Sequence, residues 1–284
     1  MSLLEQQIGI NANYIVGSHD IAFIVLDTLR YDVARDALRT GKTQNLATIL
    51  PGGQWEARHS PGNFTYAAHH AFFSGFLPTP ITPGHHQPRL FAARFPGSGT
   101  TAERTYVFDA PDIVTGLSHV GYHTLCIGGV DFFNKQSPLG SVLPGLFAES
   151  HWTPELGNNS RHSTENQVRL ATRRLAEIPR AQRVFLYINV SAIHPPNYFF
   201  LPGAREDSLA SHAAALSYVD HHLGPLFAAL RQRGPSLLII CSDHGTAYGE
   251  DGFSGHRISH PVVWTVPYAE LILPGALGTT ASGR

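Results

Sequence analysis

The sequence predicts an α/β fold, a three-layer α/β/α sandwich with a central, mostly parallel β-sheet. Short apolar runs rich in β-branched residues recur along the chain, and stretches with helical periodicity separate them. This alternation is typical of consecutive β-α-β units, whose strands run parallel. The chain has 284 residues, of which 43% are hydrophobic and 14% charged, so it can bury a large core.

The first predicted strand is the apolar segment 20–27, which has no helical period and ends at an acidic residue. Segment 111–121 is predicted to be a helix that stops at a glycine. A second strand, at 122–129, follows it directly. The order helix then strand is the repeating unit that the fold class requires.

The middle of the chain repeats this order with longer elements. Segment 163–178 is amphipathic, and we expect Ser163 to be the N-cap of its helix. A strand at 183–191 comes next. Segment 204–233 is predicted to be helical, with a kink or break at Gly224-Pro225, because proline removes a backbone hydrogen bond.

Two more strands complete the sheet, at 236–241 and 268–275. Segment 77–105 is rich in Pro, Gly and His without a clear period, and we expect it to be a loop-rich insertion over one edge of the sheet. The chain contains no internal repeat and no linker typical of a domain boundary. We therefore expect residues 1–284 to form one catalytic domain.

Charge and composition limit the expected partners. The formal net charge is −1, so nothing indicates electrostatic binding to nucleic acid or to an anionic membrane. The first 20 residues lack a basic segment followed by a long apolar one, and no segment is long enough to cross a bilayer. From these features we expect a cytoplasmic protein with no membrane partner. The oligomeric state stays open.

Acidic residues follow two of the predicted strands. Asp27 ends the first strand, and Asp243 and His244 follow the strand at 236–241. In parallel sheets the carboxyl ends of strands meet at one edge, where ligands bind. Two carboxylates and an imidazole there form part of a metal shell, although a solvated turn with a chance histidine would give the same local sequence.

A third segment, 63–78, places a hydroxyl at the start of a predicted helix. Free backbone N–H groups and the positive end of the dipole favour an anion at such a position. Thr65 is placed to serve as both metal ligand and nucleophile. The alternative for this threonine is an ordinary N-cap.

Taken together, the three segments resemble the alkaline phosphatase superfamily, which includes sulfatases, nucleotide pyrophosphatases and lipid-headgroup transferases. "VLDTLRYD" is similar to the D-D-L-R segment of that superfamily: Asp27, Leu29 and Arg30 match, and Thr28 replaces the second acid. "TYAAHHAFFSG" is similar to the nucleophile segment T-x-x-x-H-x-x-x-x-[TS]-G, which aligns Thr65 with the nucleophile and His69 with the histidine after it.

The third motif is "DHGTAYGEDGFSGH", which resembles the sulfatase string D-H-G-x-x-x-G-E-x-G-x-x-x-[KH]. The matching residues are Asp243, His244, Gly245, Gly249, Glu250, Gly252 and His256. The three motifs occur in the family's order between residues 20 and 260. The resemblance implies an alkaline phosphatase-like fold and a metal-dependent site made of Asp27, Thr65, Asp243 and His244.

The differences from the family pattern narrow the range of activities that we expect. Sulfatases oxidise a Cys or Ser to formylglycine, and the β-carbon of Thr65 carries a methyl group that prevents formation of this aldehyde. The two-metal branches hold a second ion with an acid and a histidine after a central strand, but here only His194 is found. The resemblance therefore implies one firmly bound divalent ion, Zn or Mn, and leaves a weaker second ion open. His194 and His256 are expected to act on the substrate.

The implied activity is metal-dependent hydrolysis of phosphoric or phosphonic esters through a covalent phosphothreonine at Thr65. Two alternatives stay open: a phosphoryl-group transferase that uses an alcohol acceptor at the same site, and a non-catalytic module that binds metal or phosphate. The expected partner is a small phosphoryl or phosphonyl ester. We also expect substrate contacts from His69 and Arg30, although His69 could instead cap its helix and Arg30 could pair with Asp27 or Asp32.

Overall fold

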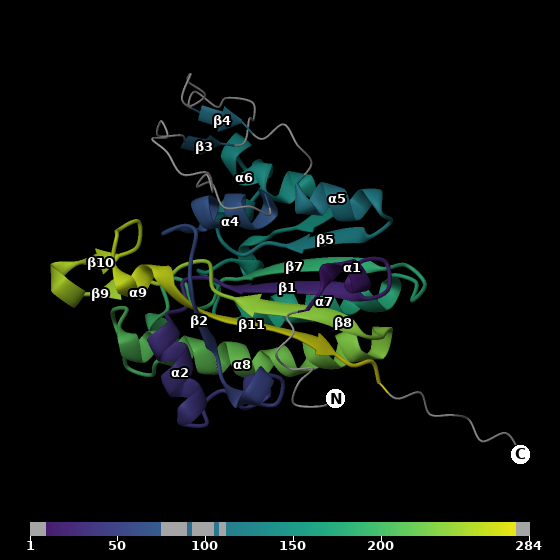
Figure 1. Ribbon diagram of the computed structural model, residues 1–284. Coiled ribbons are helices and arrows are strands. Elements are labelled where there is room, and N and C mark those ends of the chain that lie inside the picture. Colours follow the sequence, from purple (N-terminus) through teal and green to yellow (C-terminus); the bar gives the residue numbers. More distant parts are fainter. Residues whose placement is uncertain (1–9, 75–89, 93–104, 108–111, 277–284) are drawn as a thin grey trace, which may run out of the picture.

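The computed structural model describes residues 10–74, 90–92, 105–107 and 112–276. Within these residues the centre of the molecule is a seven-stranded sheet with the order β2-β11-β8-β1-β7-β5-β6 (Figure 1). Its strands are β1 (Asp20–Leu26), β2 (Glu56–His59), β5 (His123–Ile127), β6 (Glu149–His151), β7 (Val184–Val190), β8 (Ser236–Cys241) and β11 (Thr265–Leu273). Two smaller sheets pair β3 (Leu90–Ala92) with β4 (Thr105–Val107) and β9 (Ala247–Tyr248) with β10 (Ser254–Gly255).

The strands β8, β1, β7, β5 and β6 are parallel, which confirms the predicted mostly parallel α/β sheet. The last strand differs from its prediction, because β11 starts at Thr265, ends at Leu273 and runs antiparallel to β8 and β2. Between β8 and β11 the chain forms only short elements, so no long helix returns it to the other end of the sheet. Without such a crossover the next strand must run back in the opposite direction.

Helices cover both faces of the sheet (Figure 1). One face carries α2 (Tyr31–Arg39), α3 (Gln44–Ala47), α7 (Ser163–Glu177) and α8 (Leu209–Arg233), and the other carries α1 (Ala12–Ile15), α4 (Thr65–Ser74), α5 (Ile113–His119) and α6 (Pro138–Val142). The short α9 (Pro261–Trp264) leads into β11. This arrangement confirms the three predicted layers.

Strand β1 explains why the core is continuous on both sides. Ala22, Ile24 and Leu26 pack into the cluster beneath α7 and α8, whereas Ile21 and Val25 pack on the opposite face. Side chains alternate across a strand, so a strand buried on both faces is apolar throughout. The strand was predicted from an uninterrupted apolar run, and this run is a consequence of the central position of β1 in the sheet.

Two details of the helices differ from the prediction. Ser163 is the first residue of α7, and the N-cap is His162, whose side chain makes no capping hydrogen bond. Helix α8 begins at Leu209 behind a capping box of Ser208 and Ser211, and it continues through Pro225 to Arg233 without a break. The apolar face of α8 is buried on both sides of the proline, so packing holds the helix together across the lost hydrogen bond.

The predicted insertion at 77–105 lies outside the described residues, apart from β3 and the first residue of β4. In the part of the chain that is described, no helix has the length and apolar character needed to cross a membrane. The described residues surround one central sheet, and the extent of the domain over 1–284 stays a prediction.

Candidate metal and phosphoryl-transfer site

Neighbouring parallel strands place the two acids side by side. Strands β1 and β8 pair in a register that sets Val25 opposite Cys241, so the residues just beyond both carboxyl ends are neighbours. Asp27 and Asp243 occupy these positions and are fully buried. The structure therefore places the two strand ends next to each other, as the sequence predicts.

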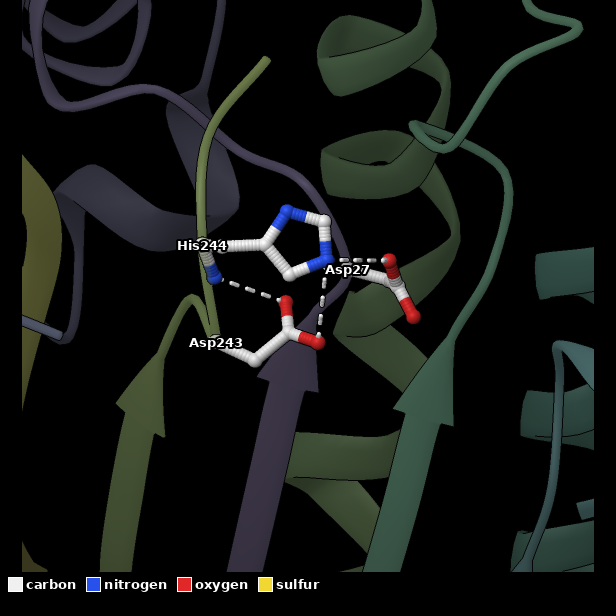
Figure 2. A group of neighbouring side chains, drawn as sticks. All are labelled: Asp27, Asp243 and His244. Carbon is white, nitrogen blue, oxygen red and sulfur yellow. Dashed lines mark hydrogen bonds and ion pairs between the residues drawn. The ribbon is translucent and has the colours of Figure 1, made fainter. Parts of the chain in front are cut away.

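The imidazole of His244 faces both carboxylates (Figure 2). Its Nε2 lies 3.8 Å from Asp27 Oδ1 and 3.6 Å from Asp243 Oδ2. The hydroxyl Oγ1 of Thr65 lies 3.4 Å from His244 Nε2 and 3.4 Å from Asp27 Oδ2. Two ligands that each lie about 2.1 Å from a tetrahedral ion are about 3.4 Å apart, so these separations fit a shared cation.

Hydrogen bonds leave one oxygen of each carboxylate unpaired. Asn189 Nδ2 donates to Asp27 Oδ2 at 2.8 Å, and the backbone N–H groups of Thr28 and His244 donate to Asp243 Oδ1 at 3.2 and 3.0 Å. Asp27 Oδ1 and Asp243 Oδ2 are buried and have no hydrogen-bond partner among the described residues. These two oxygens are the ones that face His244, and a divalent cation would satisfy both.

The backbone fixes which nitrogen of His244 is available. Its Nδ1–H donates to the carbonyl of Gly245 at 2.8 Å, which leaves the lone pair on Nε2 directed at the two acids. A hydrogen bond of this kind sets the tautomer of metal-binding histidines. Gly245 itself packs against α9, because a Cβ there would lie 2.0 Å from the carbonyl oxygen of Val262. The glycine of the D-H-G motif therefore keeps the histidine in place.

Burial disfavours the charged forms of Asp27, Asp243 and His244. Burial raises the pKa of Asp27 to about 6 and that of Asp243 to about 7, and for Asp27 the neighbouring charge of Asp243 adds to the rise. Burial lowers the pKa of His244 to about 4. Two buried carboxylates that resist ionisation and a neutral imidazole are the donor set that a cation stabilises, because the positive charge favours both carboxylate anions.

Helix α4 brings Thr65 to this point. Thr65 is 2% exposed and is the first residue of the helix. Ser60 ties the preceding loop to the acids, since its hydroxyl donates to the backbone oxygen of Asp243. The backbone of Gly62 lies so close to the helix that a Cβ would be 2.4 Å from Ala68 N. These contacts explain why the threonine hydroxyl faces the carboxylates.

His69 lies one turn further along α4 and both of its ring nitrogens have partners. Its Nδ1–H donates to the carbonyl of Thr65 at 2.6 Å, and the hydroxyl of Tyr187 contacts Nε2. Burial lowers the pKa of His69 to about 3. Nδ1 is also 3.8 Å from Asp243 Oδ2. These contacts hold His69 within its own helix and against β7 without capping either end of the helix, and its substrate contact stays a prediction.

His194 and His256 flank the site on the solvent side. The ring of His256 is 4.7 Å from that of His244 and 5.5 Å from that of His194. His194 Nδ1 contacts the carbonyl of Pro195 at 2.6 Å, and Asn158 donates to the same carbonyl at 2.7 Å. Both histidines are half-buried, whereas Asp27, Asp243 and His244 are fully buried.

Arg30 is only 3% exposed and its guanidinium is fully engaged. Nε and Nη2 donate to the two oxygens of Asp32 at 2.9 and 2.6 Å, and Nη1 pairs with Glu250. Glu250 in turn accepts from the backbone N–H of Tyr248 at 2.6 Å. These pairs support the structural alternative for Arg30, which joins the start of α2 to the loop after His244.

Several residues of the site were not found from the sequence. Asn189 orients Asp27, Ser60 anchors the loop before α4, and Thr28 takes the left-handed conformation (φ 63°) that lets its N–H reach Asp243. The polar amide of Asn189 in the apolar run "VFLYINV" is a signal that would have identified it. Ser60 and Thr28 have no such signal, because their roles depend on tertiary contacts.

Comparisons with known proteins identify the family and similar folds. The family model described as Sulfatase matches residues 21–268. A comparison with curated protein sequences found no match. Among solved structures, the periplasmic domain of the phosphoethanolamine transferase EptC from Campylobacter jejuni is 15% identical, with a TM-score of 0.58 over 89% of this chain and 79% of that chain.

Two further structures are similar. The periplasmic domain of EcEptC from Escherichia coli, solved in complex with Zn, is 12% identical, with a TM-score of 0.60 over 89% of this chain and 72% of that one. The lipoteichoic acid synthase LtaP from Listeria monocytogenes is 12% identical, with a TM-score of 0.57 over 93% of this chain and 69% of that one.

These findings correct one expectation. The similar EptC domains are periplasmic, so the cytoplasmic location expected from the sequence is wrong. The basis for that expectation was the composition of the first 20 residues, which does not by itself determine the location of a domain. The family model covers most of the chain. The chain therefore belongs to the sulfatase family, and its fold is similar to that of a solved protein in the alkaline phosphatase superfamily.

Proposed function

We propose that this protein is a metal-dependent transferase that moves a phosphoryl-ester group to an acceptor alcohol through Thr65. The proposal combines the family with the site. The similar solved structures are named phosphoethanolamine transferases and a lipoteichoic acid synthase. Because Thr65 replaces the Cys or Ser that sulfatases modify, transfer through a threonine ester is a better account than sulfate hydrolysis.

One observation carries the proposal. The two unpaired carboxylate oxygens, the free Nε2 of His244 and the hydroxyl of Thr65 converge from three distant segments of the chain. The ligand atoms of Asp27, Asp243 and His244 all lie within 4.8 Å of one another. Such convergence is costly for an apo protein, since buried acids without partners destabilise the fold. A structural role alone would not favour it.

The bound ion, Zn or Mn, would lower the pKa of the Thr65 hydroxyl and offset negative charge on the phosphoryl oxygens. Thr65 Oγ1 then forms a bond to phosphorus while the bond from phosphorus to the leaving alcohol breaks, and the leaving alcohol takes up a proton. In the second half the acceptor oxygen bonds to phosphorus and Thr65 is released. Water in place of the acceptor gives hydrolysis, so the same residues serve both reactions.

His194 and His256 would face the substrate in this mechanism. Burial, together with the charges of His244 and His194, lowers the pKa of His256 to about 3. A neutral imidazole can accept a hydrogen bond from the hydroxyl of the acceptor alcohol, whereas a protonated imidazole cannot. We assign His256 to the acceptor and His194 to the leaving group, and a weaker second ion between them stays open.

The test measures both reactions at once. Metal-loaded protein is incubated with bis-p-nitrophenyl phosphate, with and without glycerol or ethanolamine, and products are identified by mass spectrometry. A transferase forms the new ester of the added alcohol and turns over faster in its presence. Hydrolysis product alone, at a rate that no alcohol changes, would contradict the proposal.

Thr65→Ala and Thr65→Ser provide the matched pair. The alanine variant should bind metal and lose turnover by at least about a thousandfold, because the nucleophile is absent. The serine variant keeps the hydroxyl and should retain measurable turnover and the covalent phosphoester, detectable as a mass increase on the peptide that contains residue 65. A wild type that binds metal but turns over none of these esters would favour the non-catalytic module.

A further inference from the structure

Arg257 follows His256 and contacts the segment that directly precedes Thr65. Its backbone N–H donates to the carbonyl of Asn63 at 2.8 Å, and its Cζ lies 4.8 Å from the centre of the Phe64 ring. Phe64 directly precedes Thr65, and His256 directly precedes Arg257. The guanidinium of Arg257 therefore packs against the segment that carries the Thr65 hydroxyl, and its backbone continues the loop that carries His256.

The charge of Arg257 is not neutralised. No carboxylate among the described residues lies within ion-pair distance of it, in contrast to Arg30, which pairs with Asp32 and Glu250. Arg257 is solvent-exposed and its backbone has the left-handed conformation, with φ 68°. This conformation is strained for any side chain other than glycine, so it indicates that tertiary contacts hold this residue in position.

The charge balance of the site leaves a role for this cation. Asp27 and Asp243 together offset a divalent ion, so a phosphoryl anion meeting the Thr65 alkoxide would bring uncompensated negative charge. The guanidinium of Arg30 cannot offset this charge, because it is already paired with Asp32 and Glu250. Arg257, whose guanidinium lies over the ring of Phe64 next to Thr65, is an unpaired positive charge beside this segment.

We propose that Arg257 recognises a negatively charged oxygen of the substrate, and that the site favours esters carrying a second negative charge over singly charged ones. A planar guanidinium stacked on Phe64 keeps its N–H groups free at its edge, where they can bind phosphate or carboxylate oxygens. The inference rests on the proposed function and narrows its substrate class to phosphoesters that carry a second negative charge.

The test compares Arg257→Gln and Arg257→Lys with wild type on two substrates. At pH 8, p-nitrophenyl phosphate is a dianion and bis-p-nitrophenyl phosphate is a monoanion. Arg257→Gln should lower kcat/KM by about ten- to a hundredfold on the dianion and by a clearly smaller factor on the monoanion. The lysine variant should recover part of the loss, because it keeps the charge but not the planar fork.

Salt gives a second readout. The kcat/KM of wild type on the dianion should fall as ionic strength rises, and the dependence should be flatter in Arg257→Gln, because screening acts on this charge. Arg58→Gln is the matched control: Arg58 also stacks on an aromatic ring, 5.0 Å from the centre of Tyr268, but its charge is paired with Glu56. We expect no change in either measurement for this control.

Binding of inorganic phosphate separates the two proposals. Isothermal titration of the metal-loaded wild type should show phosphate binding that weakens by about tenfold or more in Arg257→Gln. If no ester is turned over but this difference is present, the transferase proposal fails and the role of Arg257 stands. Equal losses on both esters, or equal phosphate affinity in wild type and variant, would overturn the inference.

Discussion

Replacement of Asp243 by asparagine separates two effects on stability: the destabilisation caused by a buried carboxylate and the stabilisation gained when metal binds. Asn has nearly the same shape, and its Oδ1 can accept the backbone N–H bonds that Asp243 Oδ1 receives from Thr28 and His244. Its amide nitrogen takes the place of the unpaired Oδ2, 3.6 Å from the lone pair of His244 Nε2. The variant therefore removes one buried negative charge and leaves the surrounding hydrogen bonds in place.

The pKa of Asp243 gives the expected size of the effect. Burial raises this pKa from 3.8 to about 7, which corresponds to roughly 4 kcal/mol of destabilisation when the apo protein is fully ionised. A folded-state pKa above the unfolded one gives stability that is complete below about pH 4 and lost as the pH rises towards 7. At about 2 °C per kcal/mol, the metal-free variant should melt up to about 8 °C higher than metal-free wild type at pH 8.

Thermal unfolding in chelated and zinc-supplemented buffer measures both effects. Free zinc at a hundred times its Kd should stabilise wild type by about 2.7 kcal/mol, a rise in Tm of about 5 °C, and should leave Asp243→Asn unchanged. Metal content after dialysis is the control for loss of the ion. A metal-free variant that melts below metal-free wild type at pH 8, or a variant with an undiminished zinc shift, would refute the reasoning.

Three further predictions concern the surroundings of the site and the opposite end of β1. Gly245→Ala should destabilise the protein by about 3 kcal/mol or more and lower its zinc affinity, as measured by urea unfolding and zinc titration, because the added Cβ would lie 2.0 Å from a backbone oxygen; an unchanged midpoint would contradict this. Burial lowers the pKa of His212 to about 3, so this neutral histidine should cost stability as the pH falls below about 6.5; His212→Gln should give a flatter curve of unfolding free energy against pH between 6.5 and 4. Arg233→Met should cost about 3 kcal/mol in urea unfolding because it removes the 2.8 Å partner of the buried Asp20 and leaves it only the longer ion pair with Arg183, at 3.5 Å, and the double variant with Asp20→Asn should recover part of that loss.

The layers of the fold were predictable from local patterns. Strand β1 is buried on both faces, so its apolar run identifies it without knowledge of its neighbours. The direction of β11 was not predictable in the same way, because it depends on the short connection after β8 and not on the composition of the strand. The N-terminus of α7 was placed one residue late, since a serine suitable as a cap is also suitable as the first helical residue.

The candidate site also has a part that local sequence predicts and a part that depends on tertiary contacts. Acids at the ends of two strands identify Asp27 and Asp243, because parallel neighbours must deliver them to one edge. The partners of Arg30 were left open, and only the position of Glu250 above α2 decides that the guanidinium is paired. The unpaired charge of Arg257 also had no signal in sequence, since it depends on what lies nearby in space.

The sequence by itself determined the α/β class, the order of its elements and the residue types at the two central strand ends. These follow from hydrophobic periodicity and from motifs, which are properties of short segments. Only the tertiary structure decided that the free oxygens of two buried acids, one imidazole nitrogen and a threonine hydroxyl face a common point. The physical reason is that hydrogen bonding, burial and net local charge are sums over residues far apart in the chain, and no local pattern contains those sums.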